Sequence, residues 1–246
     1  FVGKGAGQGI DGTKLTGNGN VALGVSSGLV LQGAATDNAY VGSGSGAGTT
    51  TGSNNSSLGA DSAPSLTTGS NNLMLGHDAG RTGSPGGNYT SENNAIVLGD
   101  ENIAEAQIQV DWTVASDQRD KTDFTALDLG LDFVKALAPV TYKWDKRSKY
   151  IDKTDVTTYN EDGSVDHEGW DITTDLNAIT HDGTHKEDWL DIGFKAQEVQ
   201  ALEEAAGYTT AAKKNLTVST SGDGKQMGLQ YSKFVPILVK AIQEQN

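Results

Sequence analysis

The chain has 246 residues, a formal net charge of −14 and a pI of about 4.5. A surface this acidic repels phosphate backbones, so nucleic acid is not an expected partner. Cysteine is absent, which excludes disulfides, thiolate catalysis and cysteine–zinc sites, and no apolar run approaches the roughly 20 residues of a membrane span, so membrane insertion is not expected. Because the chain begins with Phe1, we expect it to be a piece of a longer protein.

The composition changes sharply near residue 115. Residues 1–115 hold 23 of the 32 glycines but only 12 of the 50 charged residues, and residues 116–246 hold the remaining 9 glycines and 38 charged residues. This contrast predicts two domains, a Gly-rich segment over 1–115 and a charged domain over 116–246, with the boundary between Trp112 and Lys121.

The first segment contains an internal repeat. Short apolar runs, each closed by Gly, follow Asn20, Asn38, Asn55, Asn72 and Asn94, and the closing glycines are 18, 17, 17 and 23 residues apart. The opening Phe-Val-Gly resembles the end of an earlier copy, and Thr-Gly-Ser-Asn-Asn turn sequences separate the later copies. One such short strand cannot bury its own surface, but stacked copies can, and a trimer can bury more. The pattern is similar to the β-rolls and β-prisms of trimeric fibres, so we expect a mainly β repeat rather than a disordered linker.

The second segment predicts a mixed α/β domain. A polar insertion over 145–190 carries turn signals at Asp162-Gly163 and Asp182-Gly183. Around it, apolar spacing predicts helix over 127–137, strand over 140–144, strand over 192–194, helix over 199–206, a hairpin about 221–224 and a helix from Ser232.

The final helix carries one apolar stripe, made of Phe234, Val235, Leu238, Ala241 and Ile242. At the C-terminus this stripe could bundle three chains, or it could pack within one subunit. The sequence leaves both arrangements open.

Four blocks in order carry a resemblance to a known family: Ser116-Asp-Gln-Arg-Asp-Lys121, then residues 129–144, 192–199 and 229–244. Their order resembles the endosialidase-type intramolecular chaperone at the C-termini of phage tailspikes and tail fibres. The resemblance covers residues 116–246, and the insertion over 145–190 is its least matched part. It implies a homotrimer whose chaperone domain guides folding of the fibre in front of it and is then removed by autoproteolysis. When the residues of this sequence are matched one by one to the family's motif, the resemblance implies Ser116 as nucleophile, Lys121 as general base, and Ala115–Ser116 as the scissile bond.

Ser116 and Lys121 can carry out this cleavage if Lys121 is able to act as a base. A serine hydroxyl needs a base to take its proton, and Ser-Lys pairs are a known variant of that arrangement. A free lysine has a pKa of about 10.4, so it serves as a base only where burial or a nearby cation lowers that value. Arg119 is a candidate cation, and Trp112 and Val114 are candidate desolvating neighbours.

The sequence leaves open both the chemical route of the cleavage and the way in which Lys121 reaches Ser116. One route is attack of the Ser116 hydroxyl on the Ala115 carbonyl, an N-to-O acyl shift followed by hydrolysis. The other is attack by a water that Lys121 activates. Residues five apart do not meet on a strand or on a helix, so either a turn or a neighbouring chain must bring Lys121 to Ser116.

The sequence therefore predicts the terminus of a phage tail fibre involved in host attachment through an unidentified receptor. Residues 1–115 would stay on the virion, and the chaperone domain would be released in the host cytoplasm after a single self-cleavage, without turnover on external substrates. The alternative is a trimeric cell-surface adhesin with an uncleaved assembly domain. A polysaccharide depolymerase ranks last, because it needs paired carboxylates in a cleft and the first segment offers little beyond Asp100-Glu101.

No cofactor and no metal site are predicted. His181 and His185 have the spacing of metal ligands, but the Asp-Gly between them signals a turn.

Overall fold

The computed structural model describes residues 1–10, 12–151, 175–212 and 216–245, with the backbone of the strands at 153–155, 158–159, 165–167 and 170–172. The chain divides into two compact units. Unit 1 comprises Phe1–Ile103, Lys143–Asp188 and Thr220–Gln226, and unit 2 comprises Ala104–Tyr142, Trp189–Ser219 and Met227–Asn246. The polar insertion thus belongs with the repeat segment, and the domain boundary at residues 115 and 116 stays a prediction.

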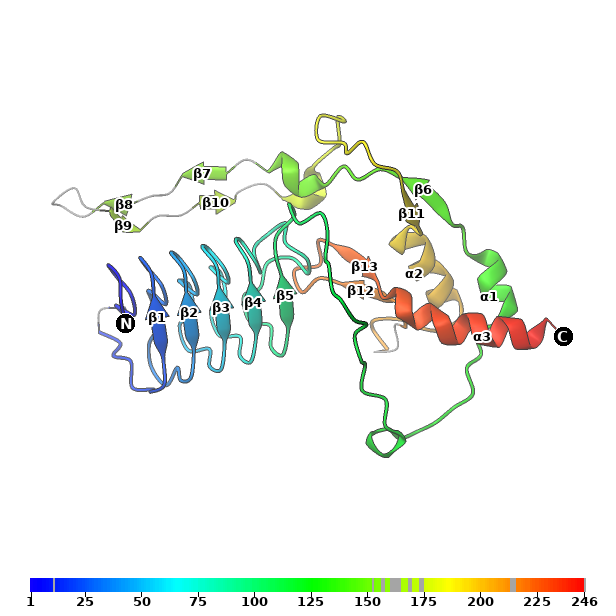
Figure 1. Ribbon diagram of the computed structural model, residues 1–246, viewed down its shortest axis with the longest axis horizontal. Helices are drawn as coiled ribbons and strands as arrows, with labels where there is room; N and C mark the ends of the chain where they lie inside the picture. Colours follow the sequence, from blue (N-terminus) through cyan, green and yellow to red (C-terminus); the bar gives the residue numbers. More distant parts are fainter. Residues whose placement is uncertain are drawn as a thin grey trace. The chain divides into compact units, whose positions relative to one another are not determined.

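Unit 1 is built on a β-solenoid. Its five parallel strands lie side by side in one row, one for each repeat (Figure 1): β1 (Val21–Leu23), β2 (Ala39–Val41), β3 (Ser56–Leu58), β4 (Leu73–Leu75) and β5 (Ile96–Leu98). Each strand pairs with the next one in constant register, so that Ala22, Tyr40, Ser57, Met74 and Val97 form one buried column. Val2 adds a parallel bridge to Leu23, as expected of the end of an earlier copy. The mainly β repeat is confirmed, and its strands pair within one chain.

The asparagine before each apolar run explains why the repeats stack. Asn38, Asn55 and Asn72 are buried, and each amide donates to the side-chain oxygen of the preceding asparagine at 2.9, 3.1 and 3.0 Å. Each amide also donates to a backbone carbonyl of the same solenoid, as from Asn55 to Gly69 at 2.8 Å. The ladder satisfies polar groups that burial would otherwise leave unpaired, which is costly.

The closing glycines are required by close backbone contact. Gly24, Gly42 and Gly59 have φ of 135–140°, a region that favours glycine. A Cβ on Gly42 would lie 2.3 Å from the carbonyl oxygen of Gly59, and the other two positions are as crowded. Stacking thus explains both residue types, the Asn that precedes an apolar run and the Gly that closes it.

The inserted part of unit 1 contains two antiparallel strand pairs. β7 (Lys153–Asp155) pairs with β10 (Trp170–Ile172), and β8 (Thr158–Tyr159) pairs with β9 (Val165–His167). The turn predicted at Asp162-Gly163 lies outside the described residues. The turn at Asp182-Gly183 is present, because Gly183 has a φ of 86° and the Asp182 carboxylate accepts the Thr184 N–H at 2.8 Å.

Unit 2 is the mixed α/β region. Its elements are α1 (Leu131–Ala136), β6 (Val140–Tyr142) paired antiparallel with β11 (Asp191–Gly193), α2 (Ala196–Ala205), the paired strands β12 (Val218–Thr220) and β13 (Met227–Leu229), and α3 (Phe234–Glu244). A single apolar cluster joins them, centred on Leu129, Phe133, Val199, Val218, Phe234 and Ile237. The helix predicted from residue 127 begins at Leu131.

The apolar stripe of α3 divides between two environments. Phe234, Ile237 and Ala241 are buried within unit 2, whereas Val235, Leu238, Val239 and Ile242 are exposed. The buried residues thus pack within one subunit, and the exposed residues remain available for bundling with other chains. Over the part of the chain that the structure describes, no helix combines the length and hydrophobicity of a membrane span.

Candidate functional site

The candidate site lies in the connection that opens unit 2. Between residues 104 and 130 the only regular element is η1, a short 3-10 helix over Gln118–Asp120. Asp117 begins this helix, since its carboxylate accepts the backbone N–H of Arg119 at 2.9 Å. Lys121 ends it by donating its own N–H to the Gln118 carbonyl at 3.2 Å.

This turn brings Ser116 and Lys121 together. The Lys121 Nζ donates to the Ser116 Oγ at 2.6 Å within one chain. Of the two ways to join residues five apart, the turn is the one seen here. A protonated ammonium donates in this contact, and a neutral amine in the same place would accept the hydroxyl proton.

Arg119 does not act as an isolated positive charge beside this pair. Its guanidinium lies 2.6 Å from the Asp117 carboxylate, and both side chains are largely solvated. Hydrogen bonding to Arg119 holds the pKa of Asp117 below its ordinary value, and the same pair raises the pKa of Arg119. Asp117 and Arg119 therefore stabilise the turn and offset each other's charge.

The site is fully open to water in the single chain. Every residue from Asn102 to Ala126 is exposed, Ser116 and Lys121 included. The side chains expected to shield the pair are among the most exposed of the chain, Trp112 at 73% and Val114 at 77%. The chain thus supplies the Ser–Lys contact but not the burial that base catalysis by lysine requires.

The segment just before Ser116 has a pattern that sequence reasoning missed. Ile108, Val110, Trp112 and Val114 alternate with polar residues, which is typical of a strand with one apolar face. In this structure the segment is in no strand, and all four side chains are at least half exposed. A search for period-two alternation across the proposed domain boundary would have found it.

Residues 116–208 match the family model described as chaperone of endosialidase. The chain contains a chaperone-of-endosialidase domain. This family is typical of the C-termini of phage tail fibres and tailspikes, and its members are self-cleaving serine peptidases. No match was found among the curated proteins or among the solved structures.

The match to the chaperone family starts at Ser116. It continues through η1, the β6–β11 pair and α2, and it spans the inserted strands of unit 1 as well. The roles of Ser116 and Lys121, and the bond that is cut, stay predictions.

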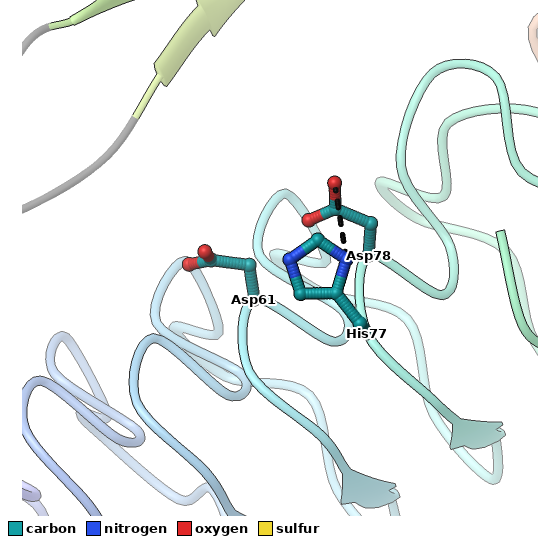
Figure 2. Close-up of side chains that lie close together, drawn as sticks. All are labelled: Asp61, His77 and Asp78. Atoms are coloured by element: carbon teal, nitrogen blue, oxygen red, sulfur yellow. Dashed lines mark ion pairs between the residues drawn. The ribbon is translucent and has the colours of Figure 1, made fainter. Parts of the chain in front are cut away.

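The histidine pair of the insertion has aromatic partners. The Tyr150 ring stacks on His181 with centroids 6.0 Å apart and meets His185 edge-on at 4.6 Å. Among the described residues, the one group of three that could hold a metal ion lies elsewhere, at Asp61, His77 and Asp78 in the solenoid (Figure 2). It was missed because its members come from different repeats.

Proposed function

We propose that this chain is the end of a phage tail fibre that attaches to a host cell, and that it cuts itself between Ala115 and Ser116. Residues 1–115 form the part that stays on the virion. Residues 116–246 direct trimerisation and folding and are then released. The family match from Ser116 onward and the 2.6 Å contact between Lys121 and Ser116 carry this proposal.

The cleavage step follows from that contact. Neutral Lys121 takes the proton of the Ser116 hydroxyl, and the Oγ attacks the carbonyl carbon of Ala115 while the bond from that carbon to the Ser116 nitrogen breaks. The nitrogen gains a proton, and water then hydrolyses the resulting ester, which leaves a carboxylate on Ala115 and a free amine on Ser116. In the second route, Lys121 activates a water that attacks the same carbonyl directly. The Ser–Lys contact is compatible with both.

Trimer formation is supported by apolar surfaces on each unit. The outer side of the solenoid sheet carries the exposed side chains of Val21, Leu23, Leu58, Ile96 and Leu98 and none with a charge. The exposed half of the α3 stripe and the alternating residues 108–114 add two more. Contiguous apolar patches mark interaction sites. Because the protein carries a net charge of −14, copies of the same chain repel one another through charged surfaces but can meet through these uncharged ones.

Assembly would also complete the catalytic site. If residues 108–114 pair with the same segment or another strand of a second chain, Trp112 and Val114 are held beside the scissile bond. Removing water from Lys121 favours its neutral, basic form. Cleavage is therefore expected to follow trimerisation.

Mass spectrometry of the expressed chain tests the proposal. We expect a C-terminal fragment that begins at Ser116, and no fragment from Ser116→Ala or Lys121→Ala. Lys135→Ala, which changes an exposed lysine of α1 in the same unit, is the matched control and should cleave normally. A different cut site, or normal cleavage of Lys121→Ala, would contradict the assignment.

A further inference from the structure

Three side chains with metal-binding atoms meet on the turns that follow β3 and β4. Asp61 comes from the first turn, and His77 and Asp78 come from the next one. Figure 2 shows the imidazole of His77 between the carboxylates of Asp61 and Asp78. One ligand atom from each residue lies within 4.8 Å of the other two.

The solenoid register brings them together. Asp61 and Asp78 are each two residues after a closing glycine, and the N–H of Asp78 donates to the carbonyl of Ala60 in the turn before. Both have positive φ, 50° and 56°, a conformation that Asp adopts more readily than most residues. Stacked turns therefore hold the two carboxylates at equivalent places, with His77 beside them.

The spacing suits ligands of one ion better than a hydrogen bond. The His77 Nδ1 lies 3.6 Å from an Asp78 oxygen and 3.6 Å from an Asp100 oxygen. A hydrogen bond of this kind needs about 2.7–3.2 Å. Two ligands that each lie about 2.1 Å from a tetrahedral ion are about 3.4 Å apart. The His77 side chain is 64% exposed, so it can rotate to close the remaining distances.

The ligand set suits a divalent cation. Arg81 lies 2.7 Å from one oxygen of buried Asp78 and fixes its carboxylate, while the other oxygen faces His77. Two of the three groups, Asp61 and Asp78, are carboxylates.

We propose that Asp61, His77 and Asp78 bind one divalent transition-metal ion. An imidazole nitrogen with carboxylate oxygens is a ligand set that zinc and its neighbours accept, whereas magnesium and calcium prefer oxygen alone. The ion would join two successive turns of the solenoid. Asp100 adds negative charge from the following turn without being assigned as a ligand.

Zinc titration of the full chain by calorimetry tests this site, with thermal unfolding as a second readout. We expect about one zinc ion per chain and a rise of several degrees in the unfolding temperature, because an ion that binds only the folded state stabilises it. His77→Ala and Asp61→Asn should each weaken zinc binding at least tenfold. His77 is exposed, so its loss should leave the metal-free unfolding temperature nearly unchanged.

Two matched variants complete the experiment. Asp37→Asn changes a different aspartate of the solenoid that also has positive φ, and His185→Ala removes a histidine of the insertion. Both should bind zinc like the parent chain. Absence of zinc binding would overturn the proposal, and so would binding that survives His77→Ala or that is lost with His185→Ala. A metal-free loss of stability in His77→Ala without zinc binding would instead identify His77 as an ion-pair partner of Asp78 and Asp100.

Discussion

The two units satisfy buried polar groups in different ways. In unit 1 the same neutral side chain recurs, and Asn38, Asn55 and Asn72 bond to one another from turn to turn. Unit 2 uses a single buried carboxylate, Glu203 of α2, which accepts from the backbone N–H of Thr217 at 2.8 Å and from its hydroxyl at 2.5 Å. The first device repeats from turn to turn between Asn20 and Asn72, whereas the second is unique.

This difference bears on how each unit reaches its register. A ladder of equivalent asparagines satisfies a strand that has slipped by one repeat almost as well as the correct one. The core of unit 2 joins α1, α2 and α3 through side chains that do not recur at a fixed spacing along the chain, so a slipped alternative is much less stable. A unit with a unique core can therefore set the register for a unit without one. Most of unit 2 lies within residues 116–246, for which that role is proposed.

The largest expected effect comes from the segment that leads into the cleavage site. Trp112→Asp places a charge on the apolar side of residues 108–114, so pairing with a second chain would bury an unpaired charge. We expect self-cleavage to slow at least tenfold. The molar mass measured by light scattering should fall below the trimer value, which is about three times the 25.7 kDa mass of one chain.

Thr113→Asp is the control for that change, because the neighbouring residue lies on the polar side of the same pattern. It should assemble and cleave like the parent chain. Equal effects from the two variants would mean that the segment does not pair through its apolar side.

The next effect, on folding stability alone, is expected from breaking the asparagine ladder. Asn55→Ala removes two donors and an acceptor. The buried Gly69 carbonyl loses its bond from the Asn55 amide, and two N–H groups of Asn72 lose their acceptor, whereas the Asn38 oxygen keeps its bonds from Tyr40 and from the backbone of residue 55. We expect a loss of about 3–5 kcal/mol in the unfolding free energy, measured by denaturant titration of the solenoid. Asn177→Ala, in the insertion, should cost less than about 1 kcal/mol because that residue is exposed.

The smallest effect is a pH dependence of the stability of unit 1, which arises from Tyr40. Burial raises the pKa of Tyr40 from 10.0 to about 12, against neighbouring polar groups, Thr49 among them, that lower it. The folded state therefore favours the neutral phenol, so this contribution is complete below pH 10 and is lost as the pH rises through 12. It amounts to about 2–3 kcal/mol.

Unfolding titrations at several alkaline pH values measure that loss. Tyr40→Phe should reduce the pH dependence between 10 and 12, at the cost of about 1 kcal/mol for the lost bonds to Asn38 and Thr49. Tyr231→Phe in unit 2 should retain it. An unchanged slope in Tyr40→Phe would assign the alkaline transition to other groups.

Much of the fold was predictable because its causes are local. Each of the five strands lies between an Asn and a closing Gly that stacking itself requires, so the repeat marks the strands. Helix spacing predicted α2 and α3, and Gly207 ends α2 with a φ of 85°. The α3 stripe did not reveal which of its residues are buried, because that depends on where α1 packs against it.

The candidate site was predictable only in part. A turn over Gln118–Asp120 was one of two ways to join Ser116 to Lys121, and Asp117 capping that turn is a local signal. The Asp61, His77 and Asp78 cluster depends on the parallel register of β3 and β4, which places residues 17 positions apart side by side. Spacing within one repeat gives no sign of it.

The central claim is that residues 116–246 guide the folding of residues 1–115 and are then dispensable. The most direct test compares residues 1–115 released by self-cleavage with a chain expressed to end at Ala115, by light scattering and thermal unfolding. We expect the released fragment to be trimeric and to resist heat, since its register was set before the guide left. The shorter chain should aggregate or unfold at lower temperature. If it instead folds unaided to the same heat-resistant trimer, the chaperone role is contradicted.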